Sequence, residues 1–255
     1  MSWRSFVAVG DSFTEGLDDL YPDGLLYRGW ADLVAAELAA RVPAFGYANL
    51  AIRGKLFGSV VADQVPAALD LEPDLISFAA GGNDALRRGF DGAGLVAQLD
   101  DVAKRLRAGG ADLLLFQFAN VSGRLPGGRI MRPRQILLND AVAEAADRYG
   151  ARVVDLWADD EFTDPLLWSV DRLHLNGYGH RRVAAHVLTA LGLVPDAAWW
   201  EPPVRGPVVS WGGRRVADAR WAGQHLAPWV KRRITGRSSG DLRTAKRPTL
   251  GPLSD

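Results

Sequence analysis

The sequence contains no cysteine among its 255 residues, which excludes disulfide bonds, thiol catalysis and thiolate metal sites. It also lacks an apolar run close to the length of a membrane-spanning helix, which is about 20 residues. Net charge is absent too, because 30 Lys and Arg balance 30 Asp and Glu. Residues 1–5 lead into an apolar segment without a hydrophobic leader, so the sequence favours a cytoplasmic protein with no membrane span.

The balanced charge is unevenly distributed along the chain. Residues 196–255 carry 11 basic and 5 acidic side chains, and the preceding residues carry the matching acidic excess. Composition changes at Pro195, so we expect one domain over 1–195, a Trp- and Arg-rich extension over 196–236 that packs on it, and a disordered basic tail over 237–255. The alternative is a free basic arm that contacts polyanions or lipid surfaces. No nucleic-acid partner is expected.

Apolar segments alternate with helical patterns along the first 195 residues. Helical apolar spacing covers residues 30–38, 60–69, 95–106, 135–149 and 176–191, whereas 122–134 is expected to be a loop. Five apolar segments with the length of buried strands fall at 6–9, 45–52, 74–80, 112–118 and 151–156. Because the connections are short, the pattern predicts a three-layer α/β/α fold with a five-stranded parallel sheet. Beyond Pro195, at most one helix is expected, near 214–226.

Polar residues follow the first three predicted strands: Ser12, Gly54 and Asn83. Because parallel strands end at one edge of the sheet, these positions should converge there. The spacing Asp171-x-x-His174 lets the carboxylate reach Nδ1–H of the histidine, leaving Nε2 to face the serine as a general base. The N–H groups of Ser12 and Gly54 and the Asn83 amide would then hold an oxyanion. Taken singly, each residue also has a plainer interpretation, as a cap, a turn or a structural histidine.

Together these residues resemble the SGNH (GDSL-type) hydrolases, a family of serine esterases with a flavodoxin-like sheet. The matching blocks are Gly10-Asp11-Ser12 with Gly16, then Gly54, then Gly81-Gly82-Asn83-Asp84, and finally Asp171 to His174. Phe13 stands where the family name has leucine. The resemblance implies that Ser12, His174 and Asp171 form a triad, with Ser12, Gly54 and Asn83 as the oxyanion hole.

The sequence therefore favours a serine esterase that forms an acyl-enzyme on Ser12 and acts on a small-molecule ester, without cofactor or metal. An acyltransferase with the same site, or a binding module without turnover, is the alternative. His180 and His186 share no helix face, which argues against a metal pair.

The pocket walls are expected from loops 17–29, 55–59, 85–92 and 122–134. Arginines near these loops suggest an anionic ester, unless they pair with acidic residues on the same loops. The possible substrate-binding arginines are Arg53, Arg124, Arg129, Arg132 and Arg134.

Overall fold

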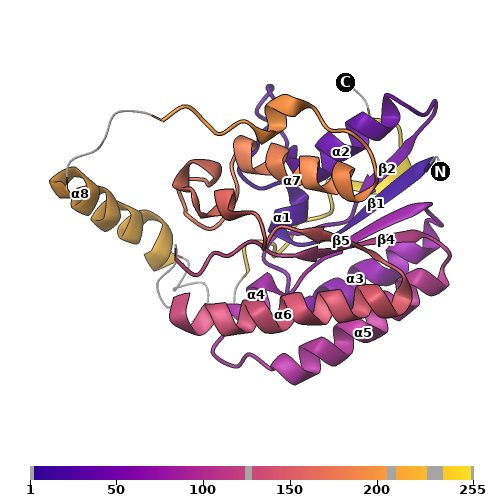
Figure 1. The fold of residues 1–255 in the computed structure, drawn as a ribbon, viewed down its shortest axis with the longest axis horizontal. Coiled ribbons are helices and arrows are strands. Elements are labelled where there is room, and N and C mark those ends of the chain that lie inside the picture. The colour runs from indigo at the N-terminus through magenta and orange to yellow at the C-terminus, as the bar shows by residue number, and fades with distance from the viewer. Residues whose placement is uncertain (1–2, 124–127, 206–210, 229–237, 254–255) are drawn as a thin grey trace.

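The computed structural model describes residues 3–123, 128–205, 211–228 and 238–253. The described residues form a six-stranded sheet with the order β5-β4-β3-β1-β2-β6, in which the first five strands along the chain run parallel. Helices cover both faces of this sheet, which gives the three-layer α/β/α arrangement (Figure 1). The strands are β1 Ser5–Gly10, β2 Gly46–Asn49, β3 Leu75–Ala79, β4 Asp112–Gln117, β5 Arg152–Asp155 and β6 Arg247–Gly251.

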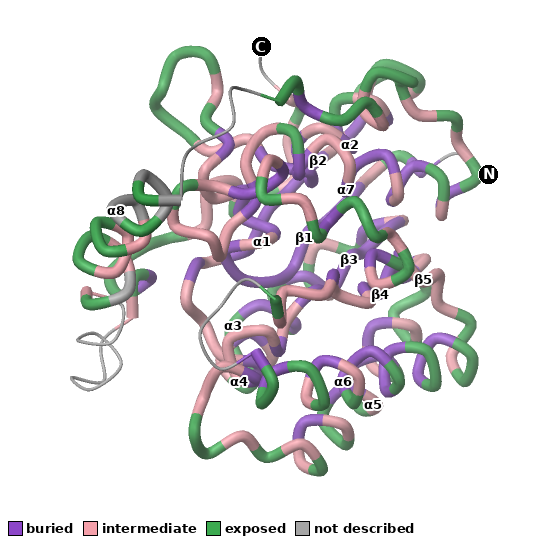
Figure 2. The backbone as a smooth tube through the Cα atoms, turned by 60° about the vertical axis from the view of Figure 1, so that its left-hand side comes forward, coloured by how far each residue is buried: buried purple, intermediate pink, exposed green. Residues whose placement is uncertain are grey.

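Two sets of helices lie on opposite faces of the sheet. One apolar core lies beneath α2 and α7, and the other lies beneath α3, α5 and α6. Figure 2 shows the buried strands between these layers. The α-helices are α1 Ser12–Glu15, α2 Gly29–Ala39, α3 Phe57–Asp70, α4 Gly82–Ala85, α5 Gly92–Ala108, α6 Gly128–Tyr149, α7 Gly177–Ala190 and α8 Trp211–Trp221. Among the described residues, none of the helices is long and apolar enough to cross a membrane.

The alternation of side chains along β1 explains why this strand is apolar throughout. Phe6 and Ala8 point into the core beneath α2 and α7, whereas Val7 and Val9 point into the opposite core. All four are fully buried, as a central strand covered by helices on both faces requires. The strand then ends at the sheet edge where Ser12 lies.

The sixth strand corrects the expectation of a five-stranded sheet. β6 runs antiparallel to β2, with Asn49 opposite Arg247, so this part of the predicted disordered tail is instead ordered at the edge of the sheet. Its sequence, Arg-Pro-Thr-Leu-Gly, has no apolar run, because an exposed edge strand buries little. Neighbouring Lys246 ties the strand to α2 through a buried ion pair with Asp32 (2.8 Å).

Helix α6 begins earlier than the sequence pattern predicts. It starts at Gly128 and contains Pro133, so most of the described part of the predicted 122–134 loop is helical. α8 and the π-helix that follows it, Ala222–Leu226, agree with the predicted helix at 214–226. α8 lies at one end of the molecule (Figure 1).

Candidate active site

Ser12 lies at the carboxyl end of β1, as the first residue of α1. Asp11 caps this helix, because its Oδ1 accepts a hydrogen bond from the Phe13 amide (3.1 Å). Gly10 permits the tight turn, since a Cβ there would lie within 2.5 Å of the Ala79 carbonyl oxygen and Thr14 Oγ1. The sharp exit from the strand thus fixes the Ser12 hydroxyl at the sheet edge.

His174 and Asp171 lie on one loop that precedes α7. An antiparallel bridge between Trp168 and Leu175 closes this loop. Asp171 Oδ1 accepts hydrogen bonds from the backbone amides of Leu173 (2.9 Å) and His174 (3.0 Å), which orients its carboxylate. Asp171 Oδ2 lies 2.5 Å from His174 Nδ1, and His174 Nε2 lies 3.0 Å from Ser12 Oγ. The three side chains therefore form a continuous hydrogen-bonded chain.

Electrostatics within this chain keep the carboxylate charged and the imidazole basic. Burial is the largest single effect and raises the pKa of Asp171, but the hydrogen bond and charge of His174 and two backbone hydrogen bonds together outweigh it, so the pKa lies below its usual range. Burial lowers the pKa of His174, but the hydrogen bond and charge of Asp171 raise it above its ordinary value. An ionised Asp171 holds the proton on Nδ1, which leaves Nε2 able to accept a proton from Ser12.

Asn83 lies at the end of β3, in the short helix α4, and its amide faces Asp11. Its Nδ2 donates hydrogen bonds to Asp11 Oδ2 (3.0 Å) and to the Lys55 carbonyl oxygen (3.1 Å). Asp11 is buried, and that burial is the main reason why its pKa is raised to about 6. Both hydrogens of the Asn83 amide thus have acceptors within the fold.

Gly54 forms the turn after β2, next to β1 in the sheet. Its φ of +73° is in the left-handed region, and a side chain there would collide with Ser238 Oγ. Preceding Arg53 is buried and pairs with Glu15 through Nε (2.9 Å). The Arg53 guanidinium also lies over the Tyr27 ring. Arg53 therefore braces this turn.

The other possible substrate-binding arginines are not brought together. Arg134 donates hydrogen bonds to the carbonyl oxygens of Ala85 and Arg87, and Arg132 lies over the Trp157 ring. Arg129 is exposed, and Arg124 lies outside the described residues. Arg53, Arg129, Arg132 and Arg134, the four that the structure describes, are not part of the cavity lining described next.

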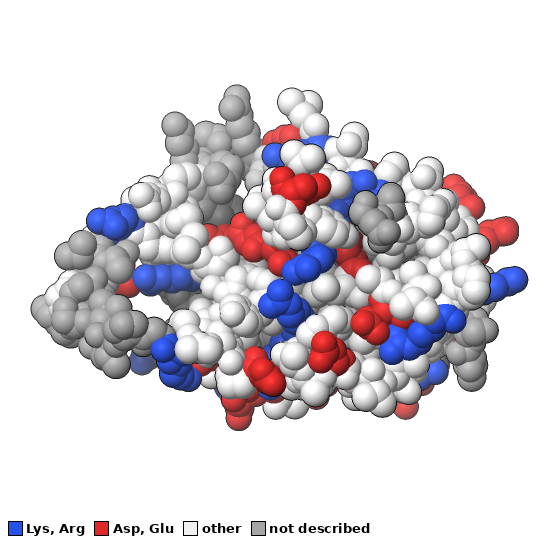
Figure 3. Space-filling model, turned by 90° about the horizontal axis from the view of Figure 1, so that it is seen from above, with Lys and Arg blue, Asp and Glu red and all other residues white. Residues whose placement is uncertain are grey.

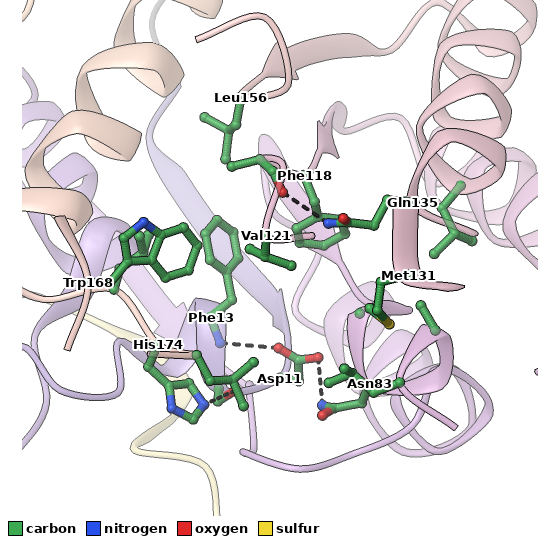
Figure 4. A pocket seen from close by; sticks show the side chains of 18 of the residues that line it. Asp11, Phe13, Asn83, Phe118, Val121, Met131, Gln135, Leu156, Trp168 and His174 are labelled. Carbon is green, nitrogen blue, oxygen red and sulfur yellow. Dashed lines mark hydrogen bonds between the residues drawn. The ribbon is translucent and has the colours of Figure 1, made fainter. Parts of the chain in front are cut away.

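A largely apolar cavity opens beside Ser12 and His174 (Figure 4). The volume of this cavity is about 130 Å³. Segments 17–29, 85–92 and 122–134 contribute to its wall as expected, the last through Met131 of α6, whereas segment 55–59 does not. The sequence interpretation missed the residues directly after β4 and β5 and the inner face of α6. The lining consists of Asp11, Ser12, Phe13, Leu17, Gly82, Asn83, Ala85, Leu86, Phe118, Ala119, Val121, Met131, Gln135, Leu138, Asn139, Leu156, Trp168, Leu173, His174, Leu175 and His180.

His180 and His186 have partners of their own, and Asp18 is the further acidic residue close to Asp171 and His174. The Asp18 carboxylate and the ligand atoms of Asp171 and His174 lie within 4.8 Å of one another. Asp171 and His174 already bind each other within this cluster. That the site holds no metal stays a prediction. His180 contacts the Trp30 amide and the Leu17 carbonyl oxygen, and burial lowers its pKa to about 4. His186 instead contacts Asp159 (2.7 Å), so the two histidines do not form a pair.

Comparison with known proteins agrees with this fold. The model of the GDSL-like lipase/acylhydrolase family matches residues 8–182, and the chain belongs to this family. As a member, it is a hydrolase that acts on ester bonds. No curated protein sequence matches the chain.

Solved structures show the same architecture. TesA is 25% identical, with a TM-score of 0.59 over 73% of this chain and 97% of its own. Axe2, an acetylxylan esterase from Geobacillus stearothermophilus, is 19% identical, with a TM-score of 0.62 over 78% of this chain and 97% of its own. The psychrotrophic esterase EstA from Pseudoalteromonas sp. is 18% identical, with a TM-score of 0.59 over 74% and 97%.

Proposed function

We propose that the protein is a serine esterase that hydrolyses carboxylic esters through an acyl-enzyme on Ser12. The observation that carries this proposal is the hydrogen-bonded chain from Ser12 Oγ to His174 Nε2 (3.0 Å) and from Nδ1 to Asp171 Oδ2 (2.5 Å). Ser12 Oγ attacks the ester carbonyl carbon while His174 Nε2 takes its proton. Asp171 orients the imidazole and stabilises the imidazolium. His174 then returns the proton to the departing alkoxide.

The second half of the reaction repeats these roles with water as the nucleophile. His174 takes a proton from the water, whose oxygen attacks the acyl carbonyl. Collapse of the second tetrahedral intermediate breaks the bond to Ser12 Oγ, and His174 returns the proton to Ser12. The acid product leaves, and the free enzyme is restored.

The oxyanion that forms in both halves would be held by the N–H groups of Ser12 and Gly54 and by the Asn83 amide. The first N–H groups of a helix lack intrahelical acceptors, which suits Ser12 to this role. Asn83 must redirect one hydrogen from its present acceptors, and the Lys55 carbonyl is the neutral one. The Asp11 carboxylate would keep the other hydrogen and so hold the amide in place.

The lining of the cavity favours an apolar acyl group. Phe13, Phe118 and Trp168 surround the space next to the triad (Figure 4). Because the described lining includes no lysine or arginine, it supports an uncharged chain rather than the anionic one that the arginines suggested.

A fluorophosphonate, which reacts covalently with activated serines, tests the proposal. We expect mass spectrometry to find the label on Ser12, with Ser12→Ala unlabelled and both Ser12→Ala and His174→Ala slower by about 10,000-fold or more on simple esters. Ser169→Ala, on the same loop as Asp171, is the matched control and should label normally. Labelling of Ser12→Ala at the wild-type level would rule out the assignment.

A further inference from the structure

One buried polar atom of the cavity lining has no role in the proposed chemistry and no hydrogen-bond partner among the described residues. Gln135 lies on the inner face of α6 with only 7% of its surface exposed, and its side chain points into the cavity (Figure 4). Its Nε2 donates a hydrogen bond to the Ala119 carbonyl oxygen (3.0 Å). Its Oε1 is buried and has no hydrogen-bond partner among the described residues.

The orientation of this amide is fixed by its surroundings. If the Gln135 amide were turned over, its oxygen would face the Ala119 carbonyl oxygen, and two acceptors would repel each other. Nε2 therefore stays on Ala119, and Oε1 remains the unpaired atom.

The neighbouring polar side chains of the lining have partners within the fold. Asn139 binds the Phe118 amide through Oδ1 and the Phe118 carbonyl oxygen through Nδ2. His180 uses both ring nitrogens, and Asn83 uses both amide hydrogens. In the part of the chain that the structure describes, Gln135 Oε1 is thus the unpaired buried side-chain acceptor of this cavity.

A buried acceptor without a donor is unfavourable. The free energy of binding therefore depends on whether the molecule that fills the cavity supplies a donor. An alkyl chain packed over Oε1 would leave it unpaired, at the desolvation cost of a buried polar group. A water molecule there would need two or more polar partners, and its neighbours in the lining are mostly apolar or already paired. A ligand with one hydrogen-bond donor on an otherwise apolar chain would pair with Oε1 and fit the apolar wall around it.

We propose that this enzyme acts on esters of hydroxy acids, with a hydroxyl on the acyl chain donating a hydrogen bond to Gln135 Oε1. This inference rests on the proposed esterase function and names the substrate class of the same site. A site with a buried acceptor discriminates against analogues that lack the matching donor, because they leave that acceptor unpaired.

Methyl esters of medium-chain acids, with a hydroxyl moved carbon by carbon along the chain, test this inference. Matched unsubstituted and methoxy esters are compared, and acid release is corrected for spontaneous lactonisation. We expect one hydroxyl position to raise kcat/KM about 3- to 10-fold over the unsubstituted ester, the gain of one neutral hydrogen bond. The methoxy ester, which can only accept, should fall below the hydroxy ester.

Variants locate the effect on Gln135. Gln135→Met keeps the length of the side chain but removes the acceptor, so the hydroxyl preference should disappear. Met131→Leu reshapes the same wall without a polar change and should affect both esters alike, leaving the preference intact. A preference that survives Gln135→Met would overturn the inference.

The wild-type series decides the question even if Gln135→Met does not fold. Absence of a preferred hydroxyl position, or equal rates for hydroxy and methoxy esters, would contradict the role of Oε1 while unsubstituted esters are still hydrolysed. If no ester is hydrolysed and the fluorophosphonate does not label Ser12, the esterase function fails, and the inference fails with it.

Discussion

Single residues set the pH at which the site can work. In the proposed mechanism His174 must be neutral to accept the Ser12 proton. Asp171 raises the pKa of His174 above the ordinary value despite the opposing effect of burial. Below this pKa the imidazole is protonated, so kcat/KM should rise with pH, with a midpoint above about 6.5. Asp171→Asn should lower both the midpoint and the plateau, the latter by about 10,000-fold. The measurement is kcat/KM for an uncharged ester across a pH series.

Asp100→Asn serves as the control for this profile. Asp100 lies on α5, where it pairs with Arg148 and the Tyr149 hydroxyl, outside the cavity lining. Its loss should leave the midpoint unchanged. A midpoint that stays fixed in Asp171→Asn would mean that this carboxylate does not set the basicity of His174.

Among the secondary-structure elements, β6 directly follows Lys246, whose buried ion pair ties it to α2. Lys246 Nζ contacts Asp32 Oδ1 and the carbonyl oxygens of Tyr27 and Arg28, all at 2.8 Å. Lys246→Met would leave the buried Asp32 carboxylate without its cation, which typically costs about 3–5 kcal/mol. We therefore expect a clear fall in the free energy of unfolding, measured by urea denaturation.

Lys104→Met, on the exposed surface of α5, is the matched control and should change stability by less than about 0.5 kcal/mol. Equal stability of the two variants would show that Lys246 does not anchor the strand.

The elements also show which parts of the structure a sequence can reveal. β1 was predictable because burial on both faces requires an uninterrupted apolar run, and the sheet edge then brings Ser12, Asn83 and His174 together. β6 was not predictable, because its place depends on pairing with a strand far away in the chain. The cavity was only partly predictable, since Gln135 and Trp168 gain their roles from packing between elements. No local pattern marks such residues.

At the scale of the whole molecule, the extension beyond Pro195 contacts the site. Trp221 Nε1 donates a hydrogen bond to the Asp171 carbonyl oxygen (3.0 Å), and Arg172 lies over the Trp221 ring while pairing with Asp218. Arg172 has a φ of +64°, a strained conformation for a residue with a side chain, which these contacts help to hold. Basic and acidic side chains are interspersed on the face shown in Figure 3.

From these contacts we expect Trp221 to position the loop that carries Asp171 and His174. Trp221→Phe keeps a ring against Arg172 but loses the hydrogen bond to Asp171, so we expect kcat to fall by up to about 10-fold with little change in KM. Steady-state kinetics on a simple ester measures kcat and KM separately. Trp200→Phe, in the same extension but packed on His186, is the control and should leave kcat unchanged. A rise in KM alone in Trp221→Phe would argue for a substrate contact instead.

The pairing of β2 with β6 leads us to expect that β6 joins the sheet late in folding. Asn49 and Arg247 are about 200 residues apart, so closing this pair costs more chain entropy than joining strands that are nearer in sequence. The parallel strands can assemble first. Before β6 pairs with β2, the outer edge of β2 carries unpaired backbone N–H and C=O groups. In a chain that remains at that stage, the unpaired edge of β2 can form hydrogen bonds with β2 of another molecule. We therefore expect β6, once paired, to shield the edge of β2 from strand addition between molecules.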